Sequence, residues 1–261
     1  MDIPAIMHGP RLKVQRAYRH IDELAGRSEP LDRSLYEIVV DQRYSIIGKA
    51  KPDIFEATFI PKEPIPETFA LIIGDAIHCL RSALDHVATE TVRQARISDA
   101  FVNFPFAEER KDLESRTGFK RIQEAIPSGD VLSLFRSQIC PYRDGNFDLW
   151  AITKLDNIDK HNFILPTVSV ADIDDINMRV GPHVMKDCGV GGDASEPIKL
   201  FRTEGYPVTI QNDFKTRVEI RFPEGFDFFG GEEVVPTLRK LSQITSETLN
   251  SFERFLCTHA A

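Results

Sequence analysis

A long amphipathic segment, residues 67–96, sets the strongest limit on how this chain can fold. Its inner positions recur at alternating spacings of four and three residues. These positions are Ile73, Ile77, Leu80, Leu84, Val87 and Thr91. Such spacing gives a helix one continuous apolar stripe, which must be buried against other elements. Gly74 lies inside this helix at a cost of about 1 kcal/mol relative to alanine, which indicates a close packing contact there.

Periodicity elsewhere in the chain predicts a mixture of helices and strands. The segments with helical spacing are 10–26, 108–125, 128–138, 147–161 and 231–257. The segments rich in β-branched and aromatic residues are 35–47 and 54–60. Region 163–222 contains further short runs of this kind, with a glycine-rich loop at 188–197 between them. Because helices and strands do not alternate regularly, we predict an α+β fold with amphipathic helices packed on a mostly antiparallel sheet.

We expect one domain over residues 1–261. Its parts are a helix-rich region at 66–161, strand-rich regions at 35–60 and 163–222, and a C-terminal helix at 231–257. The glycines of 188–197 do not predict a phosphate loop, because no Lys-Ser/Thr pair and no helix follow them.

Composition excludes several classes of protein. Apolar residues make up 42% of the 261 residues and charged residues 28%, which is typical of a soluble globular protein. The longest apolar runs are too short for a membrane span, and the N-terminus does not resemble a secretory signal. The four cysteines are far apart, which favours a reducing cytoplasm. The net charge of −8 argues against general binding of nucleic acid.

Two polar clusters are the best functional leads. On a helical wheel, the polar residues of segment 72–93 gather opposite the apolar stripe: Asp75, His78, Ser82, Asp85, His86 and Thr89, with Arg81 at the edge and within reach of Asp85. The second cluster, at 154–162, comprises Asp156, Asp159, Lys160 and His161 near a predicted helix end. Acids are unfavourable at the C-terminal end of a helix, so we predict that they find partners in the first cluster.

Three interpretations of these clusters remain open. Each cluster can be a solvated helix face, both can form a buried structural network, or both can line a site for acid–base or metal chemistry. A single metal ion bound by both His78 and His86 is not predicted, because residues eight apart lie about 12 Å apart along a helix. We therefore predict no metal and no cofactor.

The phrase "GDAIHCLRSALDHVA", followed by "FPF" and "DKHN", resembles a family of uncharacterised bacterial proteins over residues 68–165. Members of that family carry Gly-Asp-x-x-His-x-x-Arg-Ser-Ala-Leu-Asp-His and a later Asp-Lys-His. The part from Arg81 to His86 is also similar to the Arg-x4–6-His motif of HEPN-type ribonucleases, which are all-helical. That resemblance implies that Arg81 stabilises phosphate charge while His86 assists attack by an RNA 2′-hydroxyl without metal. The two residues are, however, about 140° apart on a straight helix.

These observations predict a cytoplasmic bacterial protein with a polar site between the 67–96 and 147–161 helices. Its chemistry would be that of a hydrolase or a metal-independent ribonuclease, acting on a small molecule or RNA. The candidate catalytic residues are His86, His78, Arg81, Asp85, Asp159 and His161. In this prediction His86 or His78 is the base, Arg81 stabilises the anion, and Asp85 or Asp159 orients the histidine. The alternative is a non-catalytic binding or scaffold protein whose clusters are structural. No membrane contact is expected, and homo-oligomerisation is compatible with the sequence.

Overall fold

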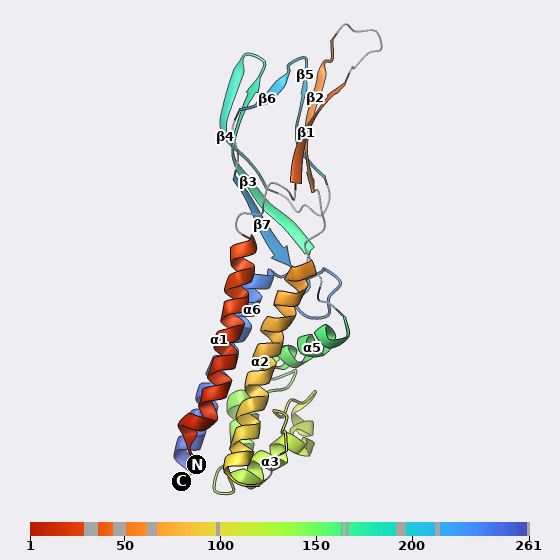
Figure 1. Ribbon diagram of the computed structural model, residues 1–261. Coiled ribbons are helices and arrows are strands. Elements are labelled where there is room, and N and C mark those ends of the chain that lie inside the picture. The colour runs from red at the N-terminus through yellow and green to blue at the C-terminus, as the bar shows by residue number, and fades with distance from the viewer. Residues whose placement is uncertain are drawn as a thin grey trace.

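A computed structural model describes residues 1–28, 36–43, 51–61, 67–97, 100–162, 164, 167–191, 197–211 and 215–259. Long helices lie side by side at one end of the molecule, and two antiparallel sheets extend from the other end (Figure 1). The predicted α+β class with antiparallel strands is therefore confirmed. Both chain ends lie at the end of the helical part that is far from the sheets.

Within the described ranges, four long helices form the helical part. They are α1 (Ile3–Ser28), α2 (Glu67–Gln94), α5 (Phe147–His161) and α6 (Val234–His259). Shorter elements connect α2 to α5. They are the 3-10 helix η2 (Arg110–Ser115), α3 (Thr117–Ala125), α4 (Val131–Ser133) and the π-helix η3 (Leu134–Ile139). Helix α2 contacts α1, α3, α5 and α6, so it is the central element of this part.

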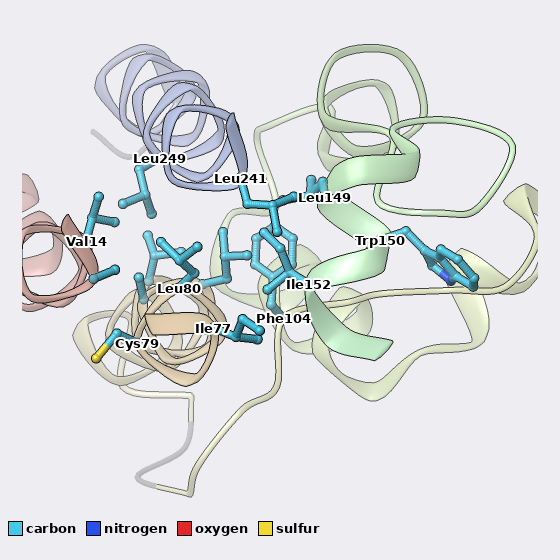
Figure 2. Close-up of a cluster of buried hydrophobic side chains, with 14 of the residues drawn as sticks. Val14, Ile77, Cys79, Leu80, Phe104, Leu149, Trp150, Ile152, Leu241 and Leu249 are labelled. Carbon is cyan, nitrogen blue, oxygen red and sulfur yellow. The ribbon is translucent and has the colours of Figure 1, made fainter. Parts of the chain in front are cut away.

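The inner stripe of α2 is buried as the sequence predicted. All six of its positions, from Ile73 to Thr91, are fully buried. Figure 2 shows Ile77 and Leu80 of α2 directed toward Leu241 of α6 and Ile152 of α5. Since burial of a leucine or isoleucine stabilises a fold by about 1.5–3 kcal/mol, this stripe is a major source of stability.

The strands that the structure describes form two antiparallel sheets. The first has the order β1 (Tyr36–Arg43), β2 (Ile54–Pro61), β5 (Ile198–Glu204). In the second, β3 (Thr167–Val180) pairs with β4 (His183–Gly191), β6 (Val208–Ile210) and β7 (Lys215–Arg221). Side chains from both sheets form a hydrophobic cluster separate from the helical core, with Phe55, Phe59, Ile176, Met178 and Val208 at its centre. The helices therefore pack mainly on helices, and the sheets mainly on each other.

Two element boundaries differ from the predictions because tertiary burial outweighs local signals. Helix α1 begins at Ile3, not at residue 10, although Pro10 then lies inside it. The backbone N–H of Ala5 donates to Asp2 Oδ1 at 3.1 Å, which caps the helix, and Ile6 and Met7 are fully buried. The short strands predicted within 163–180 form one long strand, β3, whose pairing with β4 shifts register on both sides of Ile176.

Other boundaries follow from backbone geometry. The helix predicted at 108–125 is divided at Arg116, which adopts an extended conformation between η2 and α3. Part of the loop predicted at 188–197 belongs to β4, and residues 192–196 lie outside the described residues, as do 35, 44–47, 163 and 165–166.

The prediction of a single domain stays a prediction. Among the described helices, none combines the length and the apolar character that a membrane crossing requires.

Candidate functional site

The polar face of α2 lines a cleft of about 950 Å³. Because residues three, four, seven and eight apart share one face of a helix, five polar side chains of α2 reach this cleft together. They are His78, Arg81, Ser82, Asp85 and His86. The other walls come from α5, from the start of α3 and from the segment 100–106 that follows α2. Helix α5 contributes Thr153, Asp156, Asn157 and Lys160.

Gly74 explains how closely α5 approaches α2. A Cβ atom at Gly74 would lie 2.3 Å from Oδ1 of Asp159, so the carboxylate occupies the space that any other residue would fill. This is the close contact that the helix-interior glycine predicted. Asp156 lies nearly one turn before Asp159, and His78 lies one turn after Gly74. The close approach therefore brings Asp156 beside His78.

Asp156, His78 and Ser82 form a line of hydrogen bonds at the cleft. Oδ1 of Asp156 lies 2.9 Å from Nδ1 of His78, and Nε2 of the same ring lies 3.3 Å from Oγ of Ser82. Since an ionised carboxylate only accepts hydrogen bonds, Nδ1 carries the proton and Nε2 of a neutral ring accepts one from Ser82. The Asp156 side chain is 3% exposed, whereas that of His78 is 55% exposed. The arrangement therefore places an oriented imidazole in contact with solvent.

Lys160 completes the environment of Asp156. Its Nζ donates to Oδ2 of Asp156, four residues earlier on α5. The buried carboxylate thus has a partner for each oxygen, as buried charges require. The prediction that the second cluster contacts the first is confirmed by the bond between Asp156 and His78.

Arg81 and Asp85 form a second, more deeply buried pair. Nη1 of Arg81 donates to Oδ1 of Asp85, which also accepts from the backbone N–H of Phe104 at 2.7 Å. The Arg81 guanidinium lies over the ring of Phe106, 4.7 Å from its centroid. Burial raises the pKa of the Asp85 carboxyl, while the charge of Arg81 and the Phe104 N–H act in the opposite direction. Asp85 therefore holds both Arg81 and the segment that carries Phe104.

Segment 100–106 is fixed from two sides. The Thr89 hydroxyl donates to the carbonyl of Val102 and accepts from its N–H, both at 3.0 Å. On the other side, a Cβ atom at Gly118 would lie 1.9 Å from the backbone oxygen of Asn103. The first turn of α3 can therefore pack directly on this segment only because residue 118 is glycine. One rigid wall of the cleft results.

The structure separates the other predicted residues. His86 lines the cleft but lies two turns of helix from His78, or about 12 Å along the axis, and its ring is beside Gly9 of α1. Asp159 packs over Gly74 and does not line the cleft. His161 is exposed at the end of α5 and does not line it either. Within the described ranges, no three or more His, Cys, Asp or Glu side chains are grouped to hold a metal ion.

Several residues of the cleft were not among the predicted site residues. Asp85 and Asp159 were the predicted carboxylates for orienting the histidine, whereas Asp156 occupies that place. The spacing of residues 153, 156, 157 and 160 on one face of α5 is a signal that could have identified it. Arg116 and Arg121 also line the cleft, and no local pattern in the sequence links them to α2.

The charge of the cleft differs from that of the whole chain. Among the residues that the structure describes, the lining contains four permanent cations, Arg81, Arg116, Arg121 and Lys160, and two carboxylates, Asp85 and Asp156. The chain as a whole carries −8. The excess of cations in a concave site favours an anionic ligand.

Comparison of the chain with models of protein families, with curated proteins and with solved structures gave no match.

Proposed function

We propose that this protein is a hydrolase of anionic esters, with RNA as the first candidate substrate, and that the cleft is its active site. The observation that carries the proposal is the line of hydrogen bonds Asp156–His78–Ser82 in the lining of a cationic cleft. A carboxylate that holds one imidazole nitrogen while the other faces a hydroxyl is the arrangement by which a histidine removes a proton from a nucleophile.

His78 is the general base in this proposal. Its Nε2 takes the proton of an attacking hydroxyl, and Asp156 fixes the ring orientation and stabilises the imidazolium that forms. A general base of this kind contributes about 10²–10⁴-fold to a rate. Arg81 lines the same cleft and supplies positive charge for the developing anion. His86 lies too far along α2 to act on the same atoms as His78.

In the ribonuclease form of the proposal, the attacking hydroxyl is the 2′-hydroxyl of RNA. Its oxygen forms a bond to the adjacent phosphorus while the bond from that phosphorus to the 5′-oxygen of the next nucleotide breaks. The 5′-oxygen takes a proton from solvent and leaves as a hydroxyl, and a 2′,3′-cyclic phosphate remains on the first nucleotide. The motif resemblance around Arg81 and His86 implies the same reaction, but the geometry favours His78 over His86 as the base. A hydroxyl of RNA bound in the cleft would take the place of Ser82 beside Nε2.

The test is cleavage of structured and unstructured RNA by the purified chain of 261 residues, with and without EDTA. We expect cleavage that survives EDTA, fails on DNA of the same sequence and leaves cyclic phosphate or 3′-phosphate ends. His78→Gln should abolish it, whereas His183→Gln, a change at an exposed residue of β4, should not. Cleavage that requires added Mg²⁺ or Mn²⁺, or equal cleavage by the His78→Gln variant, would contradict the proposal.

The second candidate is a non-catalytic protein in which the clusters only stabilise the fold. The observation that favours it is the hydrogen bond that the backbone N–H of Phe104 donates to Asp85, which is structural in character. It applies to the Arg81–Asp85 pair more than to His78, whose side chain is half exposed. Melting curves of variants at the two pairs distinguish these roles.

A further inference from the structure

Arg116 is a cation of the cleft that the proposed chemistry does not use. It stands directly before α3, is exposed and lines the cleft. Within the part of the chain that the structure describes, no carboxylate pairs with it. Arg81 and Lys160, by contrast, are held by buried carboxylates. Arg116 is therefore available for a ligand.

Arg121 lines the same wall and is also available. Its partner is Glu124, at 2.9 Å on the same helix, and both side chains are about half exposed. Exposed pairs of this kind contribute little to stability, so a bound anion can replace Glu124 at small cost. The guanidinium groups of Arg116 and Arg121 thus line the same cleft, and planar guanidinium groups suit the oxygens of a phosphate.

Phe101 adds an aromatic surface to the same cleft. It lines the cleft and is 63% exposed. Its backbone is held in place because the next residue, Val102, is bonded twice to Thr89. The contact of Gly118 with Asn103 fixes α3, and so Arg116, against this same segment. Arg116, Arg121 and the Phe101 ring therefore lie on the same wall of the cleft, and these contacts hold the backbone of that wall in place.

We propose that this wall is a nucleotide-binding subsite. Arg116 and Arg121 bind a phosphate group that is not cleaved, and the attached base stacks on Phe101. Stacking on an exposed aromatic ring tolerates any base, because every base has an aromatic face. This inference rests on the proposed function, because the nucleotide bound at this subsite would be the part of the RNA substrate that holds it beside His78.

The experiment is calorimetric titration of the full chain with adenosine 5′-monophosphate, adenosine and inorganic phosphate at low ionic strength. We expect saturable binding of the monophosphate and binding of adenosine at least about tenfold weaker. Arg116→Ala/Arg121→Ala should weaken the monophosphate by about tenfold or more. Lys111→Ala/Lys120→Ala removes the same charge from exposed residues outside the cleft and should not. Phe101→Ala should weaken the monophosphate but leave inorganic phosphate unchanged.

Absence of binding by the monophosphate, or equal binding by the two double variants, would overturn the subsite. Equal binding of monophosphate and inorganic phosphate, unchanged by Phe101→Ala, would overturn its assignment to a nucleotide. The same titration on His78→Gln separates this inference from the proposed function, because that variant should bind normally without cleaving RNA. Binding without any cleavage by the wild-type chain contradicts the proposed function alone.

Discussion

Nδ1 of His78 lies 2.9 Å from Oδ1 of Asp156, although the two residues are 78 positions apart in the chain. The contact joins α2 to α5 and gives an exposed imidazole a buried carboxylate as its partner. A histidine on a merely solvated helix face has no need of such a partner. The contact therefore supports a chemical role for His78 and distinguishes it from the buried Arg81–Asp85 pair, which holds the wall of the cleft.

The two pairs should respond differently to mutation. Arg81→Ala leaves the nearly buried Asp85 carboxylate without its cationic partner, so we expect a loss of about 1–3 kcal/mol in the free energy of unfolding. His78→Gln removes a half-exposed ring but keeps an N–H donor for Asp156, whose other oxygen retains Lys160, so we expect a smaller loss of less than about 1 kcal/mol. Denaturant unfolding of both variants measures the difference. Equal, large losses would favour a purely structural network.

Gly118 should tolerate no side chain. Gly118→Ala places a methyl group 1.9 Å from the backbone oxygen of Asn103, and a backbone atom held on both sides cannot move away cheaply. We expect a loss of about 1–3 kcal/mol in thermal or denaturant unfolding. Gly26→Ala in α1 is the matched control, because nothing lies within 4 Å of its Cβ position. That change should be neutral or stabilise by up to about 1 kcal/mol.

Asp159 should make the stability of the protein depend on pH. Burial raises the pKa of the Asp159 carboxyl, and the charges of Asp156 and Asp75 raise it further, against the effect of His78. A carboxyl with a raised pKa binds its proton more tightly in the folded state. The contribution of Asp159 to the free energy of unfolding is thus most favourable below the pKa of about 3.9 that the carboxyl has in the unfolded chain. It declines as the pH rises through the higher pKa of the folded state.

Asp159→Asn removes this titration. The variant should be more stable than the wild type at pH 7, and its stability should fall less steeply as the pH rises from about 4. Urea unfolding at a series of pH values measures both quantities, with the exposed Asp144→Asn as control. An unchanged slope in the Asp159→Asn variant would show that this carboxyl is not perturbed by its neighbours.

The sequence predicted the elements of this fold better than their assembly. The period of Ile73, Ile77 and Leu80 identified α2, and Gly74 predicted a close contact, because both signals are local. The partner at Gly74 is Asp159, which no local pattern specifies. Periodicity also could not show that the sheets pack on each other through Phe55 and Ile176, since either face of a strand can serve as the buried one.

The candidate site was predicted in part for the same reason. Residues on α2 share a face by helical geometry alone, so His78, Arg81, Asp85 and His86 were identified together and do line one cleft. The choice between Asp156 and Asp159 depended on how α5 is rotated against α2, which tertiary packing decides. Arg116 reaches the cleft because of the extended break before α3, and that break has no clear signal in the sequence.

The rate of RNA cleavage by Asp156→Asn tests the central claim most directly. An asparagine keeps one acceptor oxygen, and Lys160, which can only donate, takes that oxygen, so the NH₂ group faces Nδ1 of His78 and donates where the carboxylate accepted. We predict a cleavage rate about 10²–10⁴-fold below that of the wild type, measured on protein shown by its melting curve to be folded, with His183→Gln unchanged. A folded Asp156→Asn variant that cleaves RNA within about threefold of the wild-type rate would contradict the role of Asp156 and His78 in catalysis. The oriented base would then not make the contribution of about 10²–10⁴-fold that is assigned to it.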